Sequence, residues 1–241
     1  DFDSFKEDAR KAQRLMDDLV DLEIEAIDKI IEKIKSDPEP DDIKNDEITL
    51  WENIKKSGVR SRRTGLGITG LGDALAMINI KYGSKESIEI TEEIYKSLAV
   101  SAHKESVLMA VERGAFPACE PDLYKNTHPF FDRLKKASEP KIWELFLKHG
   151  RRNIALTTTA PAGSVSMLTQ TTSGIEPAFL LSYKRRKKIN PNDNDSKVDF
   201  IDELGDKWQE FTVYHHGFKQ WLDITGNEDV EKSPYYKATS N

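Results

Sequence analysis

The chain has 241 residues, of which 32% are charged and 37% are hydrophobic, and its formal net charge is −6. This length allows one large domain or two small ones around a sizeable apolar core. The acidic total gives no general affinity for nucleic acid or membranes, so neither is an expected partner and any anion site must be local. No run of about 18 apolar residues and no signal peptide is present, so the cytoplasm is the expected location.

Cysteine and histidine usage restricts the chemistry of the chain. Cys119 is the only cysteine, so a disulfide, a dithiol redox pair or a cysteine-rich zinc site cannot form within these residues. The five histidines lack the spacings typical of metal ligands, and no metal site is expected. The chain begins at Asp1 and stops soon after a Ser-Pro-Tyr-Tyr turn, which suggests a segment of a longer protein.

A long amphipathic helix is expected at residues 5–34. The apolar residues that recur there every three or four positions are Phe5, Ala9, Ala12, Leu15, Leu19, Leu22, Ala26, Ile30 and Ile34. Residues 36–45 are rich in proline and acids, which predicts an exposed linker. A second helix is expected around residues 48–56, with Gly58 at its end.

Further helices are expected up to residue 150. Ser84 has the properties of an N-cap, and the following helix should end near Gly114. The residues expected along one face of that helix are Ile88, Tyr95, Leu98, Ala102 and Met109. Residues 121–140 should form short helices and loops, and residues 141–148 a helix that ends at Gly150.

The composition changes after Arg152, because no charged residue occurs between it and Glu176. This region is rich in Thr, Ser and β-branched residues, which predicts buried strands and site-forming loops. A further strand is expected at residues 179–183, a mobile polar loop at 190–196 and a helix at 214–223.

Three glycines match a dinucleotide-binding pattern. Gly65, Gly67 and Gly70 have the G-x-G-x-x-G spacing that lets a backbone turn approach a pyrophosphate. Such a fold needs a hydrophobic strand just before the first glycine, whereas residues 59–64 are Val-Arg-Ser-Arg-Arg-Thr. The sequence therefore favours a structural role, in which the glycines permit close packing between a strand and a helix.

A second segment, residues 157–166, combines Pro, Gly and small hydroxyl residues after an apolar stretch. Such a turn can present several backbone N–H groups to a phosphate without using a charged side chain. Ser/Thr-rich turns are common, so an ordinary turn remains the simpler interpretation of this pattern alone.

A run of cations follows, formed by Lys184, Arg185, Arg186, Lys187 and Lys188. Clustered cations release counterions when they bind phosphates, so a nucleic-acid-binding module is one interpretation. The run has little aromatic interleaving and the chain is acidic overall, which favours a solvated strand end or a subunit contact.

Several of these motifs, taken in order, resemble the later part of ribonucleotide reductase catalytic subunits. The matching segments are residues 62–75, 82–84, 112–117, 158–166, 172–177, 183–186 and 233–235. The resemblance implies an α/β fold, in which this chain is a helix-rich fragment of a ten-stranded α/β barrel. Residues 1–150 would be its helical part, and residues 151–241 its strand and substrate-loop part.

The resemblance also assigns a role to the turn at residues 161–165. In the family, the loop that corresponds to Pro161, Ala162, Gly163, Ser164 and Val165 binds the substrate's phosphates through backbone N–H groups. This implication reverses the preference for an ordinary turn. The sequence departs from the family at Ala162, where Thr or Ser is usual, and at Ser164, where Thr is usual, so a side-chain contact at Ala162 is lost.

The family's chemistry uses a cysteine thiyl radical, a carboxylate and a cysteine pair, and these residues lie upstream in family members. An Asn-x-Cys-x-Glu motif is absent from this chain, and Cys119 stands at the wrong landmark to replace it. No catalytic residue is therefore assigned, and the isolated fragment is predicted to be inactive. Tyr235 and Tyr236 also lie away from the family's radical-relay tyrosines.

Residues 170–177 and 183–188 look most like the adenosylcobalamin-dependent members, so adenosylcobalamin is the cofactor that the resemblance implies for the parent protein. The implied substrate is a ribonucleoside di- or triphosphate. The other implied partners are the remainder of the parent chain and, as a candidate, a second copy in a homodimer.

Overall fold

The computed structural model describes residues 1–125, 128–193, 196–227 and 229–239. It is rich in helices and contains one small sheet. The chain divides into two compact units: Asp1–Gly67 with Thr91–Thr159, and Ile68–Ile90 with Ala160–Asn241. Within the described residues, every helix is too short or too polar to cross a membrane.

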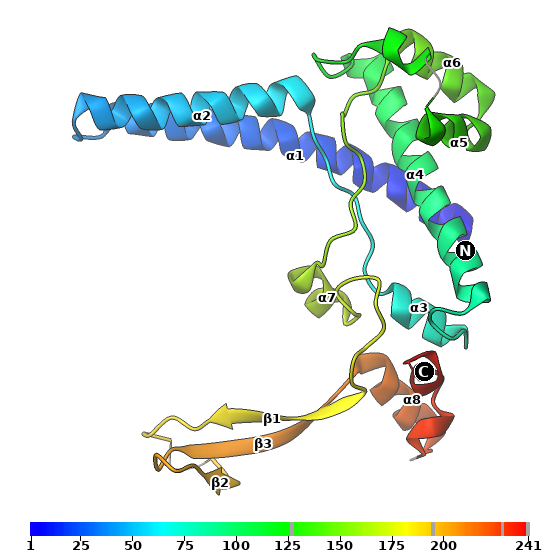
Figure 1. Cartoon of the computed structure of the whole chain (residues 1–241). Helices are drawn as coiled ribbons and strands as arrows, with labels where there is room; N and C mark the ends of the chain where they lie inside the picture. Colours follow the sequence, from blue (N-terminus) through cyan, green and yellow to red (C-terminus); the bar gives the residue numbers. More distant parts are fainter. Residues whose placement is uncertain (126–127, 194–195, 228, 240–241) are drawn as a thin grey trace. The chain divides into compact units, whose positions relative to one another are not determined.

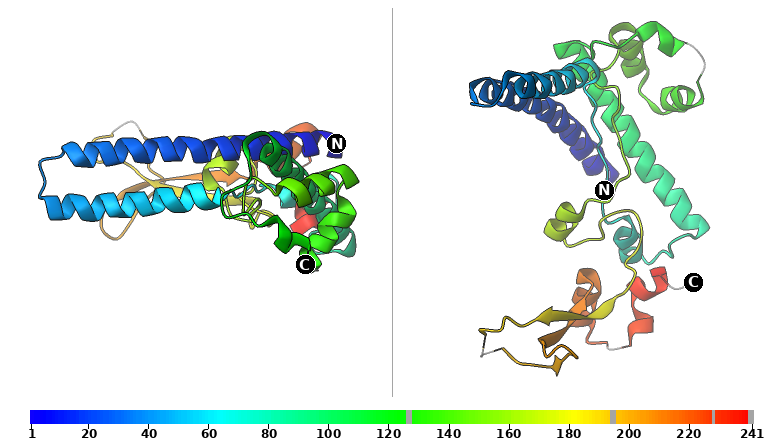
Figure 2. Two further views of the ribbon diagram at one scale, coloured as in Figure 1. Left: turned by 90° about the horizontal axis from the view of Figure 1, so that it is seen from above. Right: turned by 60° about the vertical axis from the view of Figure 1, so that its left-hand side comes forward.

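The first unit begins with two antiparallel helices, α1 (Phe2–Ser36) and α2 (Asp41–Ser61), which lie side by side in Figures 1 and 2. The long helix at residues 5–34 is thus confirmed, whereas the second helix is longer than predicted at both ends. Gly58 lies inside α2 instead of ending it, and the chain leaves the helix at Arg62, whose φ is 43°. A glycine costs a helix only about 1 kcal/mol, which packing of α2 along α1 outweighs.

One face of α1 is buried, and it differs from the apolar stripe read from the sequence. The buried residues of the helix are Ala9, Gln13, Asp17, Val20, Ile27, Ile31 and Ile34. Leu15, Leu19 and Leu22 are 63%, 55% and 57% exposed. They follow a helical spacing of their own on another side of α1, so the predicted stripe combined residues from two faces.

Helix α4 (Lys85–Arg113) starts in the second unit, and its larger part lies in the first. The Ser84 hydroxyl accepts a hydrogen bond from the Ser87 N–H at 3.1 Å, which confirms the predicted N-cap. Gly114 follows the helix with a φ of 84°, as expected for its C-terminal end. Ile88 is 61% exposed, so the expected apolar face does not extend to the start of the helix.

Three short helical segments pack beside α4, namely η1 (Pro121–Lys125), α5 (Pro129–Ala137) and α6 (Pro140–His149). The prediction of a helix ending at Gly150 is confirmed. The buried residues of this core are Val107, Leu134, Ile142, Trp143 and Phe146. Because these side chains come from α4, α5 and α6, apolar burial holds the three helices together.

Two extended segments of the first unit run parallel to each other. The Leu66 N–H donates to the Leu156 carbonyl at 2.8 Å, and the Thr158 N–H donates to the Leu66 carbonyl at 2.9 Å. Buried strands were expected across residues 152–176, but this pairing is short and Thr157 is exposed. A strand becomes buried only where other elements cover it, and in the described part of the chain residues 64–66 supply the main-chain partners of 155–158.

The second unit contains a three-stranded antiparallel sheet in the order β1-β3-β2. Its strands are β1 (Ser182–Lys188), β2 (Phe200–Ile201) and β3 (Lys207–Tyr214). The strand predicted at residues 179–183 starts later, and Phe179 is 96% exposed. Residues 194–195 of the loop predicted to be mobile lie outside the described residues.

The helices of this unit are α3 (Leu71–Met77), α7 (Gly163–Thr169), α8 (His216–Thr225), η2 (Val230–Lys232) and α9 (Pro234–Thr239). The helix predicted at residues 214–223 is α8, although Tyr214 belongs to β3 and His215 is the N-cap. The buried residues of the core are Ala76, Phe218, Tyr235 and Ala238. They bring α3, α8 and α9 together.

Candidate functional site

The predicted phosphate loop lies at the start of α7. Pro161 and Ala162 precede the helix, and Gly163, Ser164 and Val165 form its first turn. The Ala162 N–H donates to the Ser173 carbonyl at 2.9 Å, and its own carbonyl accepts from Ser166 N–H at 2.9 Å. The turn is therefore anchored at its N-cap.

The first turn of α7 leaves main-chain donors available. The N–H groups of Gly163, Ser164 and Val165 have no acceptor within the helix, because the first turn of any α-helix lacks preceding carbonyls. An ideal Cβ on Gly163 would meet no atom within 4 Å, and Val165 is 50% exposed. Because helix N-termini carry partial positive charge, the turn can receive a small anion without a cationic side chain.

The chain that returns from α7 is attached to the start of α3. The Gly70 N–H donates to the Thr172 carbonyl at 3.0 Å, and the Thr172 N–H donates to the Asp73 carboxylate at 2.9 Å. Asp73 is only 6% exposed, and its second oxygen lies 3.1 Å from Nε2 of His215. One buried carboxylate thus joins α3, the segment behind the loop and the N-cap of α8.

Tyr235 completes the surroundings of Asp73. Burial, together with the Asp73 charge, raises the pKa of the Tyr235 phenol above its ordinary value. An ideal Cβ on Gly217 would come within 2.0 Å of the Tyr235 hydroxyl, so this position has room only for glycine unless the ring moves. The sequence carries no signal of this cluster, because its other members lie 99 or more positions away from Asp73 and share no motif with it.

The glycines of the G-x-G-x-x-G match allow close packing. An ideal Cβ on Gly67 would lie 2.8 Å from the Thr158 carbonyl oxygen, and one on Gly65 would lie 3.2 Å from the Thr158 side chain. Gly70 has a φ of 70° and precedes α3. The structural interpretation of these glycines is therefore supported, although Gly65 and Gly67 pack against an extended segment instead of a helix.

The basic run occupies strand β1, where every residue is exposed. Arg186 donates to Glu210 at 2.8 Å and lies over the Phe200 ring at 4.4 Å. Lys184 lies 3.7 Å from Glu210, and Lys188 lies 2.5 Å from Asp206. Alternate cations of the strand thus pair with acids of the second unit, which supports a solvated strand and leaves less charge for nucleic acid.

The first unit contains a buried polar network close to its two paired extended segments. Asp17 is fully buried, and it accepts hydrogen bonds from Arg62 at 2.8 Å, Arg152 at 3.2 Å and Asn153 at 2.8 Å. Burial alone would raise the pKa of Asp17, but these partners, led by Arg62, outweigh it and hold the pKa below its usual value. The network connects α1 to the residues that directly precede the paired segments 64–66 and 155–158.

Asp17 also lies close to two other carboxylates, those of Asp18 and Asp21. Arg62 bonds to Asp21 at 2.7 Å, and Arg113 bonds to Asp18 at 2.7 Å. Arginines therefore compensate the charge of this acidic group, and the geometry is that of an ion-pair network.

Cys119 lies in the irregular stretch after α4, partly buried. Its sulfur is 3.9 Å from the Tyr124 hydroxyl, and an ideal Cβ on Gly150 would come within 2.6 Å of that sulfur. The thiol is thus a small side chain packed against the end of α6.

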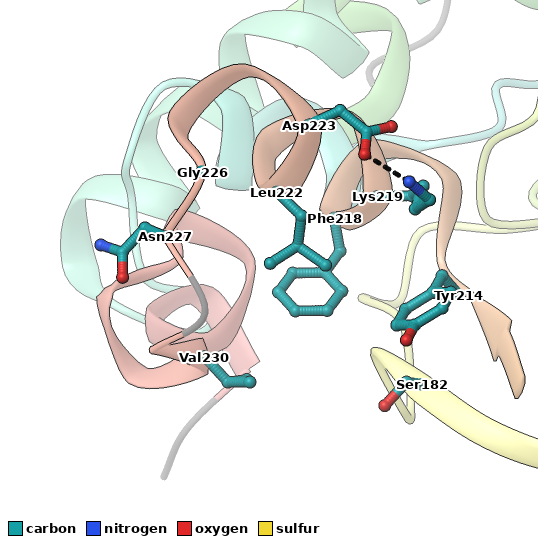
Figure 3. A pocket seen from close by; sticks show the side chains of 9 residues that line it. All are labelled: Ser182, Tyr214, Phe218, Lys219, Leu222, Asp223, Gly226, Asn227 and Val230. Carbon is teal, nitrogen blue, oxygen red and sulfur yellow. Dashed lines mark hydrogen bonds and ion pairs between the residues drawn. The ribbon is translucent and has the colours of Figure 1, made fainter.

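The second unit also contains an open cavity of about 510 Å³, drawn in Figure 3. Phe218 and Leu222 of α8 lie between Val230 on one side and Tyr214 with Ser182 on the other (Figure 3). Its lining also contains Lys219 and Asp223, which form an ion pair with each other. Because these two charges compensate each other, the cavity has mixed apolar and neutral polar walls.

The sequence model described as "Ribonucleotide reductase, barrel domain" matches residues 1–211. The chain therefore belongs to the ribonucleotide reductase barrel-domain family.

Two relatives with high coverage of this chain are named as dependent on vitamin B12. A "Vitamin B12-dependent ribonucleoside-diphosphate reductase" of Thermoplasma acidophilum is 31% identical over 230 residues, which cover 94% of this chain and 23% of the relative. The protein of that name from Mycobacterium tuberculosis (strain H37Rv) is 29% identical over 185 residues, covering 77% of this chain and 20% of the relative. The chain thus spans about a fifth to a quarter of these relatives.

Another relative carries a different name. The "Ribonucleoside-diphosphate reductase subunit alpha" of Chlamydia pneumoniae is 30% identical over 142 residues, which cover 52% of this chain and 14% of the relative. The chain is thus similar to reductases with and without vitamin B12 in their names.

Proposed function

We propose that the parent of this chain is a ribonucleotide reductase, which converts ribonucleotides to 2′-deoxyribonucleotides by thiyl-radical chemistry. In this proposal residues 161–165 bind the phosphates of a ribonucleoside diphosphate. The observation that carries the proposal is the first turn of α7, whose three main-chain donors have no acceptor within the helix. The family match and the names of the relatives support the same activity.

Residues 1–241 would form part of a ten-stranded α/β barrel, with the helical part at 1–150 and the strand and substrate-loop part at 151–241. The parallel pairing of Leu66 with Thr157 supports this arrangement, because neighbouring barrel strands of an α/β protein run parallel. In the barrel, the strand at residues 155–158 leads directly into the phosphate loop.

The remainder of the parent chain would supply the catalytic cysteines. The only thiol of this chain belongs to Cys119, which is packed against Gly150, so no step of the radical reaction is assigned to these residues. The chain's own contribution is to bind and orient the substrate. A homodimer and a cytoplasmic location are the expected assembly and compartment of the parent.

Adenosylcobalamin is the proposed radical source of the parent, since two relatives with high coverage of this chain are named vitamin B12-dependent. The sequence has no local cobalamin-binding motif, so the cofactor is assigned to the remainder of the parent. When bound, it would supply the initial radical for the thiol.

The proposal is tested by removing a single main-chain donor from the loop. Proline is well tolerated at the first position of a helix, and Ala162 is outside the helical region with ψ of 75°, so Gly163→Pro should delete one N–H group while keeping α7. We expect about a tenfold or greater loss of affinity for a ribonucleoside diphosphate, measured by calorimetry on the complete protein.

Ser164→Ala is the matched comparison, because it removes a side-chain hydroxyl and keeps the backbone N–H. It should weaken binding far less than Gly163→Pro does. Equal effects of the two variants would argue for side-chain recognition, and unchanged binding by Gly163→Pro would remove this loop from the substrate site.

A further inference from the structure

Helix α4 carries a buried histidine that has no hydrogen-bond partner. His103 is 1% exposed, and neither of its ring nitrogens is hydrogen-bonded to any of the described residues. Its ring packs edge-on against Phe146, with the ring centres 4.7 Å apart. Buried polar side chains in folded proteins almost always have a partner, so this imidazole requires an explanation.

A second unsatisfied group lies in the same part of the first unit. Arg151 donates from Nη2 to the Ile154 carbonyl at 2.8 Å, whereas its Nε is buried without a hydrogen-bond partner in the described structure. Its guanidinium lies over the rings of Tyr124 at 5.6 Å and Phe131 at 5.8 Å. Among the described residues, this partly buried guanidinium has a carbonyl partner and no salt bridge, although inward-lying arginines are usually paired.

Both groups line one cavity, of about 250 Å³. It lies between α4, α5 and the segment at residues 151–157, all of which belong to the first unit. Apart from His103 and Arg151, its walls are mainly apolar, and these apolar residues are Ala99, Phe130, Phe131, Leu134, Ile154, Ala155 and Leu156. Apolar walls with a few convergent polar groups are typical of small-molecule sites.

We propose that this cavity binds a small carboxylate with a compact apolar body, whose oxygens accept hydrogen bonds from the Arg151 Nε–H and the His103 imidazole. The carboxylate would neutralise the guanidinium, and its apolar part would contact the phenylalanines of α5. This site is separate in the sequence from the phosphate loop and does not depend on the proposed reductase activity.

The chemistry of the two groups favours a carboxylate over other occupants. Burial, together with the Arg151 charge, lowers the pKa of His103 to about 3, so the imidazole is neutral and offers one N–H donor. A metal cation would be repelled by Arg151, and water would satisfy the donors but leave the guanidinium uncompensated. The apolar walls disfavour a multiply charged anion such as phosphate, because much of its hydration shell would be lost without replacement.

The test is a calorimetric titration of the complete protein with benzoate, and with benzamide and inorganic phosphate as comparisons. Benzamide has nearly the same shape as benzoate without its charge. We expect saturable binding of benzoate and at least about a tenfold weaker binding of the other two compounds. Crystals soaked in benzoate should show the carboxylate against His103 and Arg151.

Two variants attribute the binding to this cavity. His103→Phe and Arg151→Gln should each weaken benzoate binding by about tenfold or more. His216→Phe is the matched control, because His216 is exposed at the start of α8 in the other unit, and it should leave benzoate binding unchanged. Thermal unfolding of each variant identifies any loss that comes from misfolding.

Three results would each overturn the proposal. They are no binding of benzoate, equal binding of benzoate and benzamide, and unchanged benzoate binding by a folded His103→Phe variant. His103→Phe retains a ring that can pack on Phe146, so it is expected to fold even though the hydrogen-bonding group is gone.

Discussion

Among single residues, Asp17 brings several arginines of the first unit together. Its carboxylate is fully buried, and it compensates Arg62, which is only 5% exposed, and Arg152. A buried ion pair adds little net stability over apolar packing, but removing one member leaves the other charge unpaired. The residue is therefore more costly to lose than its pairwise contacts suggest.

Replacement of Asp17 by Asn should lower the free energy of unfolding by about 3–5 kcal/mol, because the buried Arg62 keeps only the half-exposed Asp21 as its counter-charge and the partly buried Arg152 loses its ion pair with Asp17. Urea denaturation at pH 7 measures this loss. Asp28→Asn on the same helix is the control, since Asp28 is 51% exposed in its pair with Lys55 and should contribute less than about 1 kcal/mol.

The same variant should change the dependence of stability on pH. The folded protein holds the pKa of Asp17 below its ordinary value, so its contribution is present above the pKa of the unfolded chain. That contribution is lost as the pH falls through the folded pKa. Asp17→Asn should therefore show a shallower decrease in stability on acidification, and an identical decrease in both proteins would contradict this account.

Within helices, a single glycine can decide how closely another segment of the backbone approaches. Gly72 lies in α3, where an ideal Cβ would come within 2.4 Å of the Pro177 Cα, whereas an ideal Cβ on Gly58 in α2 would meet nothing within 4 Å. Two glycines in helices thus have opposite roles. One permits contact with another backbone, and the other only weakens its helix.

Substitution of alanine at the two positions should therefore have opposite effects. Gly72→Ala should destabilise the protein by about 1–3 kcal/mol, because the Pro177 backbone must move away from α3. Gly58→Ala should stabilise it by about 0.5–1 kcal/mol through helix propensity. Thermal unfolding of both variants against the unchanged protein measures the two effects, and destabilisation by Gly58→Ala would show a constraint that the packing of α2 does not explain.

The ends of helices were predictable from the sequence where capping residues mark them. Ser84, Gly114 and Gly150 marked helix ends correctly, because capping depends on residues a few positions apart. Gly58 was misleading, since its small intrinsic cost cannot stop a helix that is packed along a neighbour. Strand β3 was missed for a similar reason, because its pairing with β1 is decided between residues 20 to 32 positions apart.

In the function proposed here, the 241-residue chain is one part of a larger enzyme. The isolated chain should show no reductase activity, because it lacks the thiols of the reaction. The complete protein should reduce ribonucleotides only when adenosylcobalamin is added. An assay of deoxyribonucleotide formation with and without the cofactor tests this, and cofactor-independent activity would assign the parent to a different radical source.

The order of its motifs, without any coordinates, was enough to indicate the ribonucleotide reductase family and to select residues 161–165, because those signals are short and local. The three-dimensional arrangement was required for everything that depends on distant partners. It decided that Asp17 is buried among arginines, that Leu15 is exposed, and that His103 and Arg151 share a cavity. Burial and charge compensation depend on which groups meet in space, and residues far apart along a chain carry no local signal of that meeting.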